Sequence, residues 1–249
     1  MPRGVRPLAF LLLALVACTE PPVEWSDEAV TPPGDPTVDS LSASIVAPTP
    51  ACVGSLRAAR AGTTLYAVWW SPRADSSALL VSARSPDGGA SWSPISPVDT
   101  SDRGATGCLR APPAIAADSA SGYVHITYGM TAPEGAGLFF AHSMDRGATF
   151  HSPVPILYGE RLGYTSVAAD GDRVVVAFED PNSTTPRIGL ALSRTMGHIF
   201  EDRLSVSNDH GLASRPIVTL KGHTIRLAWI QQTNASEPGV LRARAGTLH

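Results

Sequence analysis

The sequence has little excess charge of either sign and no apolar run long enough to cross a membrane. Its 19 basic and 22 acidic residues give a formal net charge of -3, which argues against a nucleic-acid-binding surface. Lys221 is the only lysine, so the basic charge is almost entirely arginine. One uninterrupted apolar stretch, residues 8–17, is only about half of the roughly 20 residues that a membrane-spanning helix needs.

Several chemical motifs are also missing. The chain contains no G-x-S-x-G, no H-E-x-x-H and no phosphate-binding loop, and no His/Cys/Asp group has metal-ligand spacing. We therefore expect neither a cofactor nor a metal. No apolar stripe with a helical period extends beyond a couple of turns. Short Val, Ile and aromatic runs instead alternate with turn residues, among them 22 Gly and 22 Pro, which predicts an all-β domain.

The N-terminus has the order of a secretion signal. Arg3 and Arg6 precede the apolar stretch, which ends in Leu-Val-Ala-Cys. This ending resembles the lipobox of bacterial lipoproteins, and the resemblance implies that residues 1–17 are removed and that Cys18 carries the lipid anchor. Thr19 after that cysteine is similar to lipoproteins sent to the outer membrane, so the expected location is the bacterial cell envelope. An ordinary secretion signal with an incidental cysteine is the alternative.

Residues 18–40 are rich in proline and acids and have no aliphatic periodicity. Such a segment cannot bury enough apolar surface to order itself, so we expect a disordered tether. Residues 41–249 are enough for one domain with a sizeable core.

A repeat organises this domain. Four apolar strands that end in an aromatic residue are predicted at residues 65–69, 124–128, 174–178 and 225–229. Another strand is expected before each of them, near Leu56, Ile115, Val167 and Ile217. The period of about 50 to 59 residues predicts four similar sheet units.

Between these strands one phrase recurs with the pattern Ser-x-Asp-x-Gly-x-x-aromatic. It resembles the Asp box, or BNR repeat, of the sialidase superfamily of β-propellers. A degenerate third copy, residues 193–200, has Thr195 in the Asp position. The matching residues are Ser85, Asp87, Gly89 and Trp92 in the first copy, and Ser143, Asp145, Gly147 and Phe150 in the second.

The resemblance implies blades of four antiparallel strands, with the box as the turn between the third and fourth strands. The aspartate accepts hydrogen bonds from the turn and glycine supplies a positive φ, so the box is structural rather than catalytic. Three repeats are complete, whereas the fourth lacks its last strand. We expect residues 42–46 to supply that strand beside residues 240–245 and to close a four-bladed propeller. A fragment of a larger propeller, with other blades missing or supplied by another chain, is the alternative.

Two cysteines remain once Cys18 is assigned to lipid. Cys52 and Cys108 each lie just before the first strand of consecutive repeats, at the same end of adjacent blades. In an oxidising compartment we expect a disulfide between them, worth roughly 3 to 4 kcal/mol for a 56-residue loop. Two unpaired thiols are the alternative.

The face opposite the boxes is where we expect a ligand. Arginines near a central pocket would suit a carboxylate, and sialidases hold their substrate's carboxylate with three arginines and use a tyrosine nucleophile. The sialidase Phe/Tyr-Arg-Ile-Pro signature is absent. The candidate binding or catalytic residues are Arg110, Arg161, Tyr164, Glu179, Asp180 and Arg215.

Two functions follow from this reading. The first, which the missing signature favours, is an anchored module that binds a glycan or protein without hydrolysis. The second is a divergent exo-sialidase or other glycoside hydrolase that uses Tyr164 with an acid from Glu179 or Asp180. A structural module without a ligand is a third alternative.

Overall fold

The protein is all-β in the residues that the computed structural model describes, which are 21–27, 29–31, 50–104, 106–208 and 210–249. They form three four-stranded sheets and one five-stranded sheet, all antiparallel. The described residues contain no helix, and so none that is long and apolar enough to span a membrane. The predicted signal, Cys18 and residues 42–46 lie outside the described part of the chain.

We name the four sheets blades 1 to 4 in chain order. Blade 1 contains β3 (Arg57–Ala61), β4 (Thr64–Pro72), β5 (Ala78–Ser85) and β6 (Ser96–Asp99). Blade 2 contains β7 (Ala114–Ala117), β8 (Val124–Ala132), β9 (Gly135–Ser143) and β10 (Val154–Tyr158). Blade 3 contains β11 (Thr165–Asp170), β12 (Arg173–Glu179), β13 (Ile188–Ser193) and β14 (Asp202–Ser205). Blade 4 contains β15 (Leu212–Lys221), β16 (Thr224–Gln232), β17 (Val240–Leu248), β1 (Val23–Trp25) and β2 (Ala29–Thr31).

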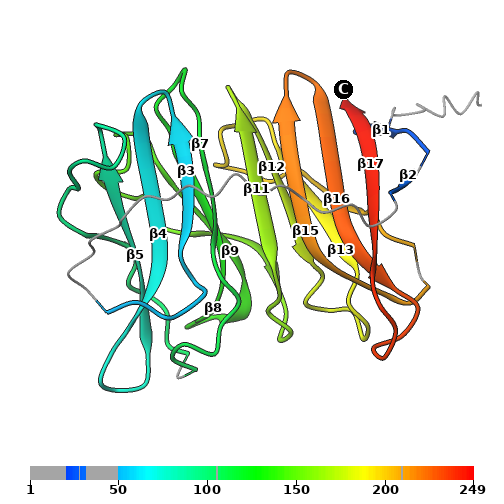
Figure 1. The fold of residues 1–249 in the computed structure, drawn as a ribbon, viewed down its shortest axis with the longest axis horizontal. Coiled ribbons are helices and arrows are strands. Elements are labelled where there is room, and N and C mark those ends of the chain that lie inside the picture. The colour runs from blue at the N-terminus through cyan, green and yellow to red at the C-terminus, as the bar shows by residue number, and fades with distance from the viewer. Residues whose placement is uncertain (1–20, 28, 32–49, 105, 209) are drawn as a thin grey trace, which may run out of the picture.

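The blades stand side by side and pack face to face, in chain order (Figure 1). Successive side chains of a strand point to opposite faces of its blade, toward the two neighbouring blades. A central blade is therefore apolar on both faces. In β8, for example, Ile126 and Tyr128 face blade 1 and join a cluster with Trp70. The four aromatic-ended strands predicted from the sequence lie within β4, β8, β12 and β16, as expected.

Closure of the propeller is not confirmed. The innermost strands β3, β7, β11 and β15 contact one another in that order. Within the described residues, β15 shows no comparable packing against β3. The described blades therefore form an open row in which each blade contacts the next.

The N-terminal part of the chain completes blade 4, but not through the segment expected. The outer edge of β17 pairs with β1, where Val23 lies opposite Leu248, and with β2, where Thr31 lies opposite Leu241. The position predicted for residues 42–46 is thus taken by strands from within the predicted tether of residues 18–40. Composition alone was misleading here. The three alternating residues Val-Glu-Trp are enough to form a strand when the unpaired edge of a sheet supplies the hydrogen bonds.

The three repeated phrases form the same turn at the ends of β5, β9 and β13, and we call residues 85–92, 143–150 and 193–200 turns 1 to 3. In each, the first serine accepts a hydrogen bond from the glycine N–H four residues later, at 2.7 to 3.0 Å. That glycine has a positive φ in every copy, 105°, 76° and 87°. At Gly197 a Cβ would also lie 2.2 Å from the Phe140 ring. The turn geometry predicted from the sequence is therefore present in all three copies.

The third residue of each turn organises its backbone. The Asp87 carboxylate accepts bonds from the Ser85 hydroxyl and from the Ser91 N–H and hydroxyl, at 2.6 to 2.8 Å. Thr195 retains two equivalent contacts, because its hydroxyl accepts from the Ile199 N–H at 3.0 Å and shares a hydrogen bond with the Ser193 hydroxyl at 3.2 Å. A hydroxyl can thus replace the carboxylate, with fewer bonds.

Cys52 and Cys108 form the disulfide expected from the sequence. The bond joins the segments that enter β3 and β7, the innermost strands of blades 1 and 2. We expect the Cys52→Ala/Cys108→Ala double variant to lose roughly 3 to 4 kcal/mol of unfolding free energy. Urea unfolding of the oxidised chain and of the variant measures this difference. An unchanged midpoint and slope would show that the loop adds nothing to stability.

The turns also predict a pH dependence. The hydrogen bonds from the Ser91 hydroxyl, the Ser91 N–H and the Ser85 hydroxyl lower the pKa of Asp87 to about 2. Because the folded pKa lies below the unfolded value of 3.8, this stabilisation is complete above pH 3.8 and is lost as the pH falls toward 2. Asp87→Asn should lower the melting temperature by a few degrees at pH 7, and the two curves should converge near pH 2. Asp172→Asn, outside the turns, is the control, and a difference independent of pH would contradict the assignment.

Candidate functional site

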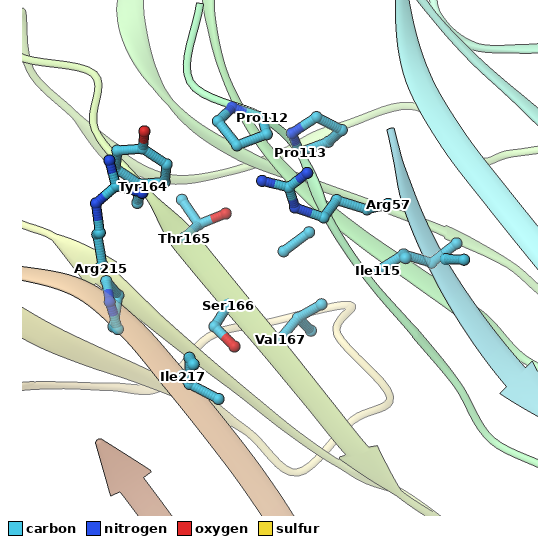
Figure 2. Close-up of a pocket in the computed structure, with 13 residues that line it drawn as sticks. Arg57, Pro112, Pro113, Ile115, Tyr164, Thr165, Ser166, Val167, Arg215 and Ile217 are labelled. Atoms are coloured by element: carbon cyan, nitrogen blue, oxygen red, sulfur yellow. The ribbon is translucent and has the colours of Figure 1, made fainter. Parts of the chain in front are cut away.

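A pocket of about 390 Å³ is lined by residues of the four innermost strands and of the segments just before them, and we call it the central pocket. All four blades line it, and Figure 2 shows Arg57 on one side with Arg215 and Tyr164 on the other. Arg57 begins β3, whereas turn 1 follows β5, which runs in the same direction two strands away. The pocket residues that begin the innermost strands therefore lie at the end of the blades opposite the repeated turns, where the sequence predicted a ligand.

A bulge in β15 positions Arg215. The pairing of β15 with β16 shifts register between Ser214 and Ile217, and Arg215 there has a φ of 54°. A positive φ is uncommon for an arginine, and bulges are frequent where a strand redirects a side chain at a functional site. The Arg215 guanidinium lies over the Tyr164 ring, 4.4 Å from its centroid.

Glu179 supports this arrangement from outside the pocket. Its carboxylate accepts the Arg215 backbone N–H at 2.9 Å, and its own N–H donates to the Tyr164 carbonyl at 3.0 Å. A Cβ on Gly163 would collide with this carboxylate, so glycine is needed where the chain passes Glu179. Glu179 thus holds the two residues that face the pocket, and it does not line the pocket itself.

Arg57 supplies the second positive charge. Its Nη1 donates to the carbonyls of Gly54 and Leu56 at 3.0 and 2.7 Å. Burial lowers the pKa of Arg57; Tyr164 raises it and Arg215 lowers it. Neither Arg57 nor Arg215 has an acidic ion-pair partner in the part of the chain that the structure describes. The pocket therefore carries two arginines whose charges repel each other.

Of the six candidates from the sequence, only Tyr164 and Arg215 line the central pocket. Arg110 is buried in an ion pair with Asp102, and its guanidinium lies 4.7 Å from the Trp70 ring centroid. Arg161 donates from Nη1 to the carbonyls of Ser183 and Thr184. Both arginines therefore hold loop segments together and do not line the central pocket.

Asp180 is likewise directed away from the pocket. Its carboxylate accepts the Asn182 N–H at 2.9 Å, and the residue borders a separate pocket near Arg187. No aspartate or glutamate lines the central pocket among the described residues.

Arg57 was not predicted from the sequence. A signal was available, because Arg57 begins the innermost strand of blade 1 much as Arg215 lies in that of blade 4. Placing Arg57 at the pocket requires the residue at which β3 begins. The sequence placed Leu56 inside that strand, whereas in the structure Leu56 lies just before it.

No model of a known protein family matches the chain, and no curated protein sequence matches it. Similar solved structures do exist. A protein of unknown function from Dyadobacter fermentans matches with a TM-score of 0.56 at 14% identity, over 75% of this chain and 50% of that one. The phage phi92 endosialidase matches with a TM-score of 0.55 at 11% identity, over 75% and 34%. The Hadza microbial sialidase Hz136 matches with a TM-score of 0.50 at 14% identity, over 78% and 46%.

These likenesses establish the fold. The chain has a sialidase-like β-propeller fold, as its repeated sequence predicted. At such low identities they carry no activity across. The matched region spans half or less of the length of each of these three proteins.

Proposed function

We propose that this chain is a membrane-anchored, sialidase-like lipoprotein whose central pocket binds an acidic glycan without hydrolysing it. The observation that carries the proposal is the pair Arg57 and Arg215, which line one pocket without acidic partners among the described residues. Guanidinium groups bind carboxylates through paired hydrogen bonds, so a sugar carboxylate would neutralise both charges. Two of the similar structures are sialidases by name, which supports a glycan as the ligand.

The absence of an acid favours binding over hydrolysis. A glycosidase needs a group that protonates the leaving oxygen, and the lining of the central pocket contains no carboxyl group within the described residues. Tyr164 could serve as a nucleophile only with a nearby base. The carboxylate of Glu179 instead accepts the Arg215 backbone N–H.

The anchor belongs to the same proposal. The lipobox-like ending at Cys18 supports attachment to the bacterial cell envelope, in which case β1 would begin only a few residues from the lipid. The repeated turns, interpreted as Asp boxes, would stabilise the blades and leave ligand recognition to the opposite face.

Binding can be tested on a glycan array with the purified full chain. We expect retention on glycans that end in a carboxylate-bearing sugar, and none on their neutral counterparts. Arg57→Ala and Arg215→Ala should each weaken binding about 10- to 100-fold, because each removes a charge-assisted interaction of about 1.5 to 3 kcal/mol.

Arg60→Ala is the matched control for that experiment. Arg60 lies on the same strand as Arg57, its Nε donates to the Gly62 carbonyl at 2.7 Å, and it does not line the pocket. Equal binding of acidic and neutral glycans, or equal losses in all three variants, would contradict the proposal.

Turnover separates binding from the hydrolase alternative. The full chain should release no fluorophore from a fluorogenic sialoside at any pH between 4 and 8. Sustained release that Tyr164→Phe abolishes would establish the hydrolase instead. Release that survives this substitution would point to a contaminating enzyme. In that case Arg60→Ala, purified in the same way, should show the same release.

A further inference from the structure

Three histidines meet at the end of the blades that carries the repeated turns, away from the central pocket. His142 is the last residue but one of β9, His151 directly follows turn 2, and His198 lies in turn 3. One ring nitrogen from each lies within 4.8 Å of the others. The ring centroids of His151 and His198 are 4.6 and 4.5 Å from that of His142.

The alternation of β9 explains why these side chains converge. Phe139 and Ala141 face blade 1, so Phe140 and His142 face blade 3. There Phe140 packs against Phe200 of turn 3, with ring centroids 5.1 Å apart, and His142 meets His198. Turns 1 and 2 have Ala90 and Ala148 where turn 3 has His198. The turn itself therefore does not require a histidine.

His142 is the feature that points to a ligand. It is only 2% exposed, and neither of its ring nitrogens has a hydrogen-bond partner in the described structure. A neutral imidazole offers one donor and one acceptor, and buried polar atoms are normally paired.

His198 is held in the tautomer that a metal ligand needs. Its Nδ1 lies 2.6 Å from the Thr195 carbonyl oxygen, which can only accept, so Nδ1 carries the proton. Nε2 is left with its lone pair, and a backbone carbonyl is a usual outer partner of metal-bound histidine. The backbone N–H of His151 donates to the backbone carbonyl of His142 at 3.0 Å, which fixes the spacing of those two residues.

We propose that His142, His151 and His198 bind one divalent transition-metal ion, with Zn²⁺ the best fit. Imidazole nitrogen suits Zn²⁺, Ni²⁺, Cu²⁺ and Co²⁺, whereas Ca²⁺ and Mg²⁺ need oxygen ligands, which this cluster does not offer. Tetrahedral Zn²⁺ with bonds of about 2.0 to 2.1 Å places its ligand nitrogens about 3.3 Å apart. The exposed rings of His151 and His198 can close this distance by rotation. Because His151 and His198 are exposed, water would supply the fourth ligand, and the ion would join blades 2 and 3.

The test is a titration of the purified, metal-stripped full chain with Zn²⁺ by calorimetry. We expect one saturable site per chain, and no heat of binding with Mg²⁺ or Ca²⁺ at the same concentrations. His151→Gln and His198→Gln should each weaken Zn²⁺ binding by at least about tenfold, because each removes a ligand at the surface without disturbing the core. Co²⁺ should give the visible absorption of a tetrahedral complex, lost in the double variant.

His210→Gln is the matched control. His210 is exposed, and its hydrogen bonds in the described structure use its backbone: its N–H donates to the Asn208 side chain at 3.1 Å, and its carbonyl accepts from the Gln231 side chain at 2.7 Å. Its substitution should leave Zn²⁺ affinity unchanged. The proposal fails if the chain shows no saturable one-site binding, or if His210→Gln weakens binding as much as the two ligand variants do. These surface variants decide the matter even if substitution of buried His142 prevents folding.

Discussion

Face-to-face packing between neighbouring sheets is the interaction on which the rest of this structure depends. A central blade has two apolar faces, and packing against the blade on each side removes both from water. The clusters between blades 1 and 2, 2 and 3, and 3 and 4 each combine side chains from two blades. This stacking brings the starts of the innermost strands together at the central pocket, and it brings the repeated turns together at the other end.

The last aromatic of each repeated turn contributes to the same packing. Phe150 of blade 2 packs against the cluster between blades 1 and 2, and Phe200 of blade 3 lies in the cluster between blades 2 and 3. Trp92 of blade 1 packs with Ile95 on the outer face of its own blade, where it helps to cover Trp69. Blade 4 has no such turn within the described residues, and its outer face retains a largely apolar pocket of about 340 Å³ beside Ile217 and Ala243. The two ends of the row are therefore not equivalent: aromatic and aliphatic side chains cover the outer face of blade 1, whereas the outer face of blade 4 retains an open pocket.

The features that the sequence predicted are local. Alternating strands such as β12 and the serine and glycine of turn 1 depend on residues close together in the sequence, and the Cys52–Cys108 pair occupies similar positions in consecutive repeats, so the sequence alone reveals each pattern. Features that join distant segments were missed or misplaced. The pairing of β1 with β17 links residues more than 200 positions apart, and no local signal in Val-Glu-Trp announces it. The histidine cluster escaped for the same reason, because its members come from three places in the chain and lack the short spacing of a metal motif.

The pocket shows where structure adds what a residue list cannot. Arg110 and Arg161 looked equivalent to Arg215 in the sequence, yet the guanidinium group of each donates hydrogen bonds to neighbouring oxygen atoms of the protein. Arg215 instead takes a left-handed backbone conformation, and that strain costs of order 1 to 3 kcal/mol. Beside it stands Arg57, whose like charge adds a repulsive contribution. Folding alone gains nothing from placing two such arginines at one pocket, whereas an anionic ligand would offset the repulsion between their charges. The strain therefore marks Arg215 as a functional position, and the charges without acidic partners among the described residues favour an anionic occupant there.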